Sequence, residues 1–271
     1  MENLPKIIHC CWLSGYPLSD QANHCLDTWK KFLPDYEIKL WTNKNYDLSK
    51  NPFLREMVKR QLWANASDYV RKDVVYQYGG IYLDLDVEMI KDPRPLYDRG
   101  AFVGFERWDD QGVTRYSIND GPGFGAAKGS PLLKEILDAY SRLEISDLVQ
   151  DNKSIYMGPD LETKFLEKKG LKLDNSEQKI MDFTILPWDY LTPMDMKGNL
   201  TLTDNSVSIH LYRNSVKNPN SNWITFQFEQ YRKKHPGASP KRIRLHLWFA
   251  HPINMFKNRF LRGKKNIESP K

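Results

Sequence analysis

The stretch that most constrains the fold runs from Tyr69 to Glu88 and reads YVRKDVVYQYGGIYLDLDVE. Its first half places apolar residues at helical spacing, and the two glycines that follow are expected to end that helix. Three apolar residues then predict a short buried strand, which ends at two carboxylates, Asp84 and Asp86. In open α/β sheets, ligands bind beyond the carboxyl ends of the strands. We therefore expect both carboxylates to face a ligand.

Asp84 and Asp86 have the spacing and the chemistry of a site for a divalent cation. Side chains two residues apart on a strand share a face of the sheet. Mg²⁺ and Mn²⁺ prefer oxygen ligands and often take one or two carboxylates together with substrate phosphates. Such a pair alone is more often two solvated turn residues. Its position at the end of the helix, glycine turn and strand favours the cation site.

The rest of the chain alternates short strands and helices, which predicts an α/β fold with a central sheet flanked by helices. Ser67 is expected to cap the central helix, which would put Asp68 in its first turn. Ser117–Ala127 reads as strand, glycine-rich loop and strand. The other expected strands are Pro5–Trp12, Tyr36–Trp41, Ala101–Phe105, Met181–Leu186 and Val207–Tyr212, and the other expected helices are Asp20–Phe32, Phe53–Trp63, Pro131–Leu143 and Gly158–Lys168.

The composition indicates a protein of a reducing compartment. The three cysteines, Cys10, Cys11 and Cys25, give neither a disulfide framework nor a zinc spacing, so we expect plain buried thiols. No window approaches 18 consecutive apolar residues, and no basic segment followed by an apolar run opens the chain. We expect neither a membrane span nor a secretory signal, and therefore a cytoplasmic location.

The charge is concentrated in a C-terminal tail. Residues 232–271 hold 12 of the 40 Lys and Arg but one acid, Glu268, so 28 basic and 33 acidic residues precede them. The tail also carries aromatic residues such as Trp248, Phe256 and Phe260. Cations mixed with aromatics suit the interface of an anionic membrane. A tail that is disordered or packed on the fold is the alternative, and nucleic acid is not an expected partner. We expect one domain over residues 1–231, followed by this tail.

Five segments resemble the DXD-containing glycosyltransferase family 32, a group that includes yeast initiating mannosyltransferases and is distantly similar to clostridial toxin glucosyltransferase domains. They are PKIIHCCW (5–12), SDYVR (67–71), YGGIYLDLDV (78–87), INDGPGFGA (118–126) and SIH (208–210). The resemblance implies a GT-A, Rossmann-like nucleotide-diphospho-sugar transferase fold with a mixed sheet. It also implies a nucleotide-sugar donor, with a UDP-sugar favoured over GDP-mannose, Mn²⁺ or Mg²⁺, and retention of anomeric configuration.

The resemblance also implies roles for the residues that match the family's motifs. Asp86 would ligate the metal directly, with His210 as a third ligand. Asp84 would bind the ribose and a metal-bound water. Tyr82 would lie beside the nucleotide, and Trp12 would stack on its base.

Four further residues would serve catalysis. Asp68 and Arg71 would hold the hydroxyls of the donor sugar and the diphosphate, while Asn119 and Asp120 would border the sugar or the acceptor. The chain departs from the family after His210, because Val216 stands where relatives often have a tryptophan.

These features lead to one hypothesis and two alternatives. We expect a retaining glycosyltransferase on the inner face of the cell membrane, which adds a sugar to a glycan or lipid-linked glycan acceptor during synthesis of a bacterial surface polysaccharide. No isolated carboxylate stands out as a nucleophile, so a same-face displacement is favoured over a covalent intermediate. A nucleotide-sugar hydrolase would use the same site with water as the acceptor. A non-catalytic membrane scaffold would need none of these residues intact.

Overall fold

The computed structural model describes residues 4–212 except Tyr16, Gln111, residues 144–148, 151–152 and 155–157, and Lys197. The chain divides into two compact units, and the described residues fall almost wholly in the first, Met1–Tyr16 with Ala22–Tyr212. The expected tail, its boundary at residue 231 and Val216 all lie outside the described residues. Among the residues described, no helix has the length and apolar composition needed to cross a bilayer.

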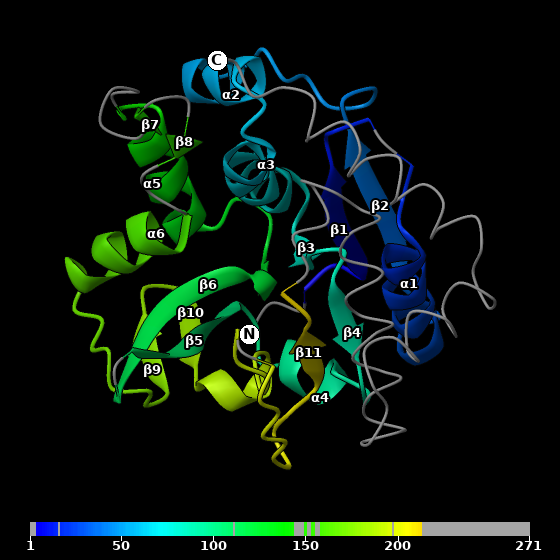
Figure 1. Cartoon of the computed structure of the whole chain (residues 1–271), viewed down its shortest axis with the longest axis vertical. Helices are drawn as coiled ribbons and strands as arrows, with labels where there is room; N and C mark the ends of the chain where they lie inside the picture. The colour runs from blue at the N-terminus through cyan, green and yellow to red at the C-terminus, as the bar shows by residue number, and fades with distance from the viewer. Residues whose placement is uncertain are drawn as a thin grey trace, which may run out of the picture. The chain divides into compact units, whose positions relative to one another are not determined.

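A mixed seven-stranded sheet forms the centre of this unit (Figure 1). Strand β1 pairs in parallel with both β2 and β3, whereas β6 runs antiparallel to β3 and β5, and β10 runs parallel to β5. The expected α/β fold, with a mixed central sheet flanked by helices, is confirmed, whereas its GT-A type stays a prediction. In sheet order the strands are β2 (Glu37–Thr42), β1 (Ile7–Trp12), β3 (Gly80–Tyr82), β6 (Val113–Ala126), β5 (Phe102–Asp110), β10 (Phe183–Leu186) and β9 (Gln178–Ile180).

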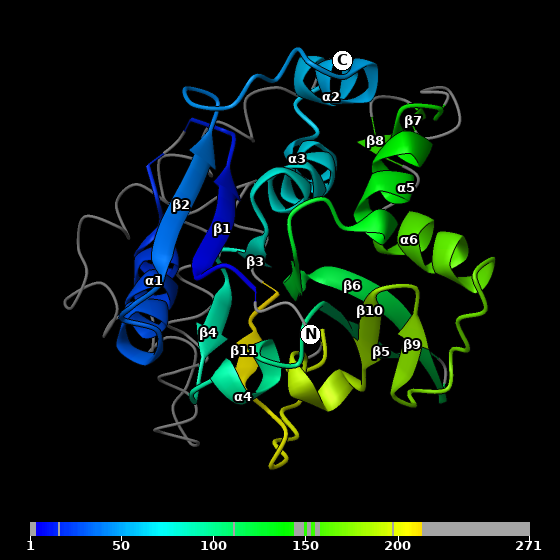
Figure 2. The same cartoon turned by 180° about the vertical axis from the view of Figure 1, so that it is seen from behind.

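Helices cover the sheet, and Figures 1 and 2 show α3, α5 and α6 close together, with α1 apart from them beside β2 and β4. Strands β4 (Val87–Met89) and β11 (Ser208–His210) form a separate antiparallel pair, as do β7 (Val149–Gln150) and β8 (Lys153–Ser154). The helices are α1 (Asp20–Phe32), α2 (Pro52–Lys59), α3 (Trp63–Tyr78), α4 (Arg94–Tyr97), α5 (Pro131–Tyr140), α6 (Gly158–Glu167) and the 3₁₀-helix η2 (Trp188–Tyr190).

The predicted start of the central helix is wrong. Helix α3 begins at Trp63, so Ser67 lies inside it and its hydroxyl donates to the carbonyl of Ala64 at 2.7 Å. A serine in mid-helix bonds in this way to a preceding carbonyl instead of capping an amide. Asp68 therefore lies in the second turn, where the helix end does not stabilise its charge.

The predicted loop between two strands at Ser117–Ala127 is also wrong, because β6 is continuous. Its pairing with β5 is nevertheless broken, since Gly104 pairs with Asn119 while the preceding Val103 pairs with Phe124. Residues 120–123 leave the β5 ladder at this break, and the Gly121 carbonyl accepts from the Asp84 amide at 2.9 Å. The glycines thus allow β6 to pair with both β3 and β5 and still to bend towards the end of β3.

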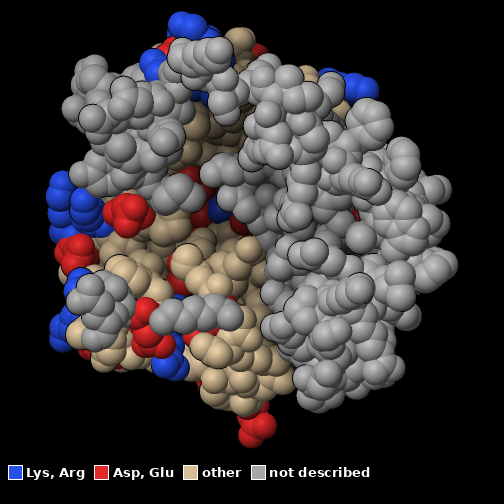
Figure 3. All heavy atoms as spheres, viewed as in Figure 1, with Lys and Arg blue, Asp and Glu red and all other residues tan. Residues whose placement is uncertain are grey.

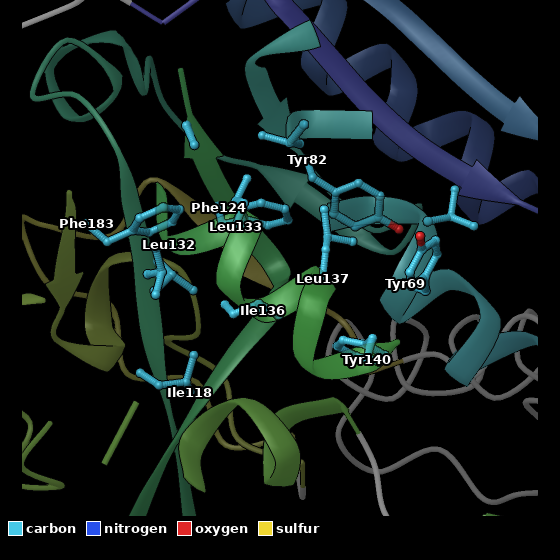
Figure 4. Packing of buried hydrophobic residues seen from close by; sticks show 14 of the residues in the cluster. Tyr69, Tyr82, Ile118, Phe124, Leu132, Leu133, Ile136, Leu137, Tyr140 and Phe183 are labelled. Atoms are coloured by element: carbon cyan, nitrogen blue, oxygen red, sulfur yellow. The ribbon is translucent and has the colours of Figure 1, made fainter. Parts of the chain in front are cut away.

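The core lies between the sheet and helices α2, α3, α5 and α6. Leu132, Leu133, Ile136 and Leu137 of α5 are buried, at the helical spacing that turns one face inward. Figure 4 shows them beside side chains of the sheet, with Tyr69, Tyr82 and Tyr140 at one side of the cluster. Tyr82 and Tyr140 are the members of this core that touch buried charges, because the Tyr82 hydroxyl donates to Asp84 and the Lys72 ammonium lies over the Tyr140 ring.

His9 connects three elements of the fold from a wholly buried position on β1. Its Nε2 donates to the carbonyl of Gly79 at 2.9 Å, and its Nδ1 accepts from the Trp41 indole at 3.0 Å. Burial lowers the pKa of His9 to about 4, because the charged ring would lose water and the Trp41 bond. His9 is therefore a core histidine that is held neutral.

We predict that His9 makes the protein acid-sensitive. Its pKa is about 4 in the folded chain and about 6.5 in the unfolded chain, so the unfolded chain takes up the proton first. The stability that the neutral ring contributes is complete above pH 6.5 and is lost as the pH falls towards 4, by up to about 3 kcal/mol. Urea denaturation at several pH values measures this loss.

His9→Gln is the control, because an amide keeps a donor and an acceptor but does not titrate. It should be less stable than the wild type at pH 7 and should lose less stability between pH 6.5 and pH 4.5. Equal pH dependence of the two proteins would contradict the assignment.

Candidate active site

A tight glycine turn brings the end of α3 to the start of β3. Gly79 ends the helix with a φ of 68°, and Gly80 follows with a φ of 106°. Both values lie in the region that glycine adopts readily and other residues rarely do. A Cβ on Gly80 would lie 2.6 Å from the carbonyl oxygen of Ile7, so β3 lies against β1 only because this residue has no side chain.

Asp84, Asp86 and His210 come together beyond the end of β3. Strand β11 pairs with β4 so that His210 stands opposite Val87, next to Asp86. The His210 Nε2 lies 3.2 Å from an oxygen of Asp86, and one ligand atom from each of the three residues lies within 4.8 Å of the others. The sequence-predicted metal residues are thus neighbours in the fold.

The donor set fits a divalent cation. The other ring nitrogen of His210, Nδ1, is buried and has no hydrogen-bond partner among the described residues. Burial raises the pKa of Asp84, and the charge of Asp86 adds to the effect, although Arg71 opposes it. Two carboxylates that repel each other beside an imidazole favour a Mg²⁺ or Mn²⁺ ion bound between them.

Arg71 lies between three carboxylates and contacts each of them. From its buried position on α3 it donates from Nη1 to Asp120 at 2.8 Å, and its Nη2 lies 3.3 Å from Asp68 and 3.4 Å from Asp84. The guanidinium also lies over the Tyr82 ring, 4.9 Å from its centroid, and the Tyr82 hydroxyl donates to Asp84 at 2.7 Å. One cation therefore fixes three of the predicted site carboxylates and one predicted nucleotide neighbour.

Asp68 is held by a second helix as well as by Arg71. Its Oδ2 accepts from the amide of Gly158, the first residue of α6, at 3.1 Å. A Cβ on Gly158 would lie 2.6 Å from the Asp68 carboxyl, so the close approach requires glycine there. Asp68 thus ties the start of α6 to the site, while burial raises the pKa of its carboxyl.

Lys72 and Glu162 belong to the same network, and sequence reasoning missed both. The Lys72 ammonium is almost wholly buried, donates to Asp120 at 2.5 Å and to the Asp68 carbonyl at 2.9 Å, and pairs with Glu162. The i, i+4 spacing of Asp68 and Lys72 would have been a signal for the lysine. Nothing in the sequence near Glu162 indicates it, because its partner lies 90 residues earlier.

One ammonium cannot neutralise two buried carboxylates, so the proton stays on one of them. Burial, together with the nearby charge of Asp120, raises the pKa of Glu162 to about 8. The pKa of Asp120 is lowered despite burial, because Lys72 and Arg71 both bond to it. At neutral pH the cluster therefore holds an ionised Asp120 and a protonated Glu162.

Asn119 lies next to the site, but Trp12 is turned inward. The Asn119 side chain accepts from the amide of Gly121, and a Cβ on Gly121 would lie 2.3 Å from the Asp84 carboxylate. Trp12 ends β1 with 5% of its surface exposed. Alternation along the strand places it on the face of Ile8 and Cys10. Stacking of Trp12 on a nucleotide base stays a prediction.

The polar site opens to the surface. Figure 3 shows the described surface hollowed near the middle of the view, with red and blue atoms at the bottom of the depression. In the same orientation, Figure 1 has the ends of α3, β3 and β6 at that place. At the site itself the Asp84 side chain is 27% exposed, so a ligand can reach it from the surface.

We predict that Lys72→Met destabilises the fold by about 3–5 kcal/mol, because it leaves Glu162 and one oxygen of Asp120 buried without their cation. Glu162→Gln should cost less than about 1 kcal/mol at pH 7, since it replaces a neutral acid by a neutral amide. Urea denaturation measures both changes.

Lys134→Met is the matched control, because Lys134 pairs with Asp138 on the surface of α5 and should contribute less than about 1 kcal/mol. A loss from Glu162→Gln as large as that from Lys72→Met would contradict the protonated state of Glu162.

Comparison with known proteins agrees with this geometry. Residues 19–103 match the family described as "Glycosyltransferase sugar-binding region containing DXD motif". Inositol phosphoceramide mannosyltransferase 3 of Schizosaccharomyces pombe is 33% identical over 141 residues, which cover 49% of this chain and 36% of that protein. Inositol phosphoceramide mannosyltransferase 1 of the same organism is 26% identical over 114 residues, which cover 38% of this chain and 34% of that protein.

The chain spans about a third of the length of these two curated relatives. Among solved structures, the PaToxG glycosyltransferase is similar with a TM-score of 0.44 and 18% identity, over 61% of this chain and 69% of that one. A glycosyltransferase involved in glycosylation of the major capsid of PBCV-1 follows, with a TM-score of 0.43 and 9% identity, over 76% of this chain and 94% of that one. Asp84 and Asp86 lie within the matched region, so the chain is similar to this family over the segment that carries the carboxylate pair.

Proposed function

We propose that this protein is a metal-dependent, retaining glycosyltransferase that moves a sugar from a nucleotide-sugar to a glycan acceptor. The observation that carries the proposal is the group Asp84, Asp86 and His210, with ligand atoms within 4.8 Å of one another, beside the buried cation Arg71. Carboxylates that can hold a cation next to a fixed guanidinium suit a substrate with a diphosphate.

The chemistry requires a place for charge that develops on the leaving group. Transfer breaks the bond between the anomeric carbon and a phosphate oxygen, and a nucleoside diphosphate leaves. A cation held by Asp84, Asp86 and His210 would neutralise part of that charge. Arg71 is preorganised by its three carboxylates, so it offers its positive charge without rearrangement. Loss of such a contact costs about 4 kcal/mol of barrier, or roughly a thousandfold in rate.

Retention is proposed to follow the same-face route. A covalent intermediate would need a free carboxylate beside the sugar, and two buried candidates are already engaged. Both oxygens of Asp120 bond to cations, and Glu162 lies behind Lys72 with its proton held at neutral pH. These residues suit the positioning of Arg71 and Asp68, not attack on the anomeric carbon.

The donor and acceptor are proposed from the family and from the names of relatives. A UDP-sugar remains the first candidate, on the resemblance described above. The two mannosyltransferases favour a mannosyl donor as the second. Their names also specify a lipid, inositol phosphoceramide, which supports a lipid-linked acceptor for this chain. We propose that the acceptor is a lipid-linked glycan of a bacterial surface polysaccharide.

A panel of nucleotide-sugars tests the donor site. We expect one class among UDP-, GDP-, CMP- and dTDP-sugars to raise the melting temperature by a few degrees in the presence of Mn²⁺. A ligand at a hundred times its Kd stabilises the folded state by about 2.7 kcal/mol. Asp86→Asn should abolish this shift and keep the native melting temperature without ligand.

Two further outcomes separate the alternatives. Release of free sugar at the same rate with and without lipid-linked acceptors would favour the hydrolase. Absence of a shift with every nucleotide-sugar, together with a cellular role that survives Asp86→Asn, would favour the scaffold.

We also propose that the protein works on the inner face of a cell membrane, held by the basic, aromatic residues 232–271. Their charge and aromatic content support the proposal. We predict that the full chain floats with vesicles containing anionic lipid, that salt weakens this binding, and that a chain ending at residue 231 loses it. Equal flotation of both chains would contradict the proposal.

A further inference from the structure

Glu162 is a buried acid that is joined to the candidate active site by direct contacts. It lies in α6, which Figure 1 shows close to α3 and α5, and 3% of its surface is exposed. Its carboxyl contacts the Lys72 ammonium, and Lys72 in turn donates to Asp120 at 2.5 Å. Asp120 accepts from Arg71 at 2.8 Å. Three contacts thus lead from Glu162 to the guanidinium that is proposed to face the donor diphosphate.

Three elements place titratable groups against Glu162. Helix α3 contributes Lys72 and Asp68, and β6 contributes Asp120. The Tyr140 hydroxyl of α5 donates to the Glu162 carboxyl at 3.5 Å. Among the described residues, Lys72 is the one cation that pairs with Glu162, and it also pairs with Asp120. With a pKa of about 8, Glu162 is neutral at pH 7 and ionises in mildly alkaline solution.

A crevice between α5 and α6 gives the Glu162 proton a path to water. It holds about 240 Å³, far more than the roughly 10–15 Å³ that a single water needs. Glu162 and Tyr140 line it together with apolar side chains of both helices and with Lys164 and Lys168. A proton can therefore leave or reach Glu162 without passing the place proposed for the diphosphate.

Ionisation of Glu162 would weaken the attraction of Arg71 for an anionic ligand. While Glu162 is neutral, the Lys72 charge is available to Asp120. Once Glu162 is ionised, two carboxylates share one ammonium, so Asp120 depends more on Arg71. The added charge also repels a diphosphate directly. At a separation of roughly 10 Å and an effective dielectric constant of about 20, one unit charge changes an affinity by on the order of tenfold.

We propose that Glu162 is a positioning residue whose proton is coupled to the donor site, so that a nucleotide-sugar binds more tightly while Glu162 is neutral. The inference rests on the proposed function, because the ligand concerned is the donor diphosphate. Coupling between two binding events is reciprocal. Donor binding therefore holds the proton on Glu162, and above pH 8 it transfers one proton from the solvent to this carboxylate.

The pH dependence of donor affinity tests the coupling. The full chain with Mg²⁺ is titrated calorimetrically with UDP-glucose and with GDP-mannose at pH 7.0 and at pH 9.5. We expect the Kd of the wild type to rise about tenfold between these values, because the free protein loses the Glu162 proton and the complex keeps it. Glu162→Gln cannot ionise, so its Kd should rise less than about twofold.

A matched control isolates Glu162 from other titrating groups. Groups near the proposed cation titrate in every variant, so their effect cancels when the ratios of the two Kd values are compared. Glu167 is exposed near the end of the same helix, and Glu167→Gln should keep the wild-type ratio. At pH 8.5, buffers of different ionisation enthalpy should reveal proton uptake by the wild type and Glu167→Gln, but little by Glu162→Gln. A purely structural role of Glu162 would change the melting temperature without changing the ratio.

Urea denaturation checks the state of Glu162 without any ligand. The folded chain keeps the proton up to about pH 8, whereas the unfolded chain releases it near pH 4.3, roughly. The folded state therefore binds more protons between these values, so Glu162 makes the stability fall as the pH rises towards 8, and this fall ends above pH 8. Glu162→Gln should lack this part of the pH dependence between pH 6 and pH 8, and Glu167→Gln should keep it.

The two measurements separate the inference from the proposed function. Identical stability curves for the wild type and Glu162→Gln would mean that Glu162 is ionised, and they would overturn the inference. Equal Kd ratios in these two proteins would overturn the coupling and leave the donor site intact. Absence of binding by both nucleotide-sugars at pH 7 would instead overturn the proposed donor site, and the coupling with it.

Discussion

The buried guanidinium of Arg71 is the interaction on which the rest of the site depends. It faces Asp68, Asp84 and Asp120, which come from α3 itself, from the end of β3 and from β6. Buried carboxylates repel one another strongly, so these three elements can meet at one point only around a cation. Because Arg71 also covers the Tyr82 ring, the same contact orders an apolar wall of the site.

Lys72 connects this arrangement to helix α6. Its ammonium pairs with Asp120 of β6 and with Glu162 of α6, while Asp68 accepts a hydrogen bond from the first amide of the same helix. Helix α6 is therefore held at both its beginning and its second turn by residues of α3. A ligand that contacts Arg71 or Asp68 meets side chains that other residues already hold in place. These side chains therefore rearrange little when the ligand binds.

Much of the fold could be read from patterns of spacing. Alternation and helical periodicity predicted β1, β2, α1, α5 and α6 close to their observed bounds, because these elements have continuous patterns bounded by turn residues. The start of α3 and the form of β6 could not be read in this way. Ser67 has a capping side chain but bonds to Ala64, and the glycines of β6 look like a loop although they allow two strands to approach closely.

The sequence by itself determined the carboxylate pair at the end of β3 and the glycine turn before it. Both depend on neighbours within about 20 residues, where spacing and local propensity act, whereas the roles of Asp68 and Arg71 came from the resemblance to a known family and stay predictions. Only the tertiary structure decided that His210 stands beside Asp86 and that Lys72 balances Asp120 and Glu162. Those contacts join residues separated by 48 to 124 positions, and no local pattern records a partner that the chain reaches only after it has folded.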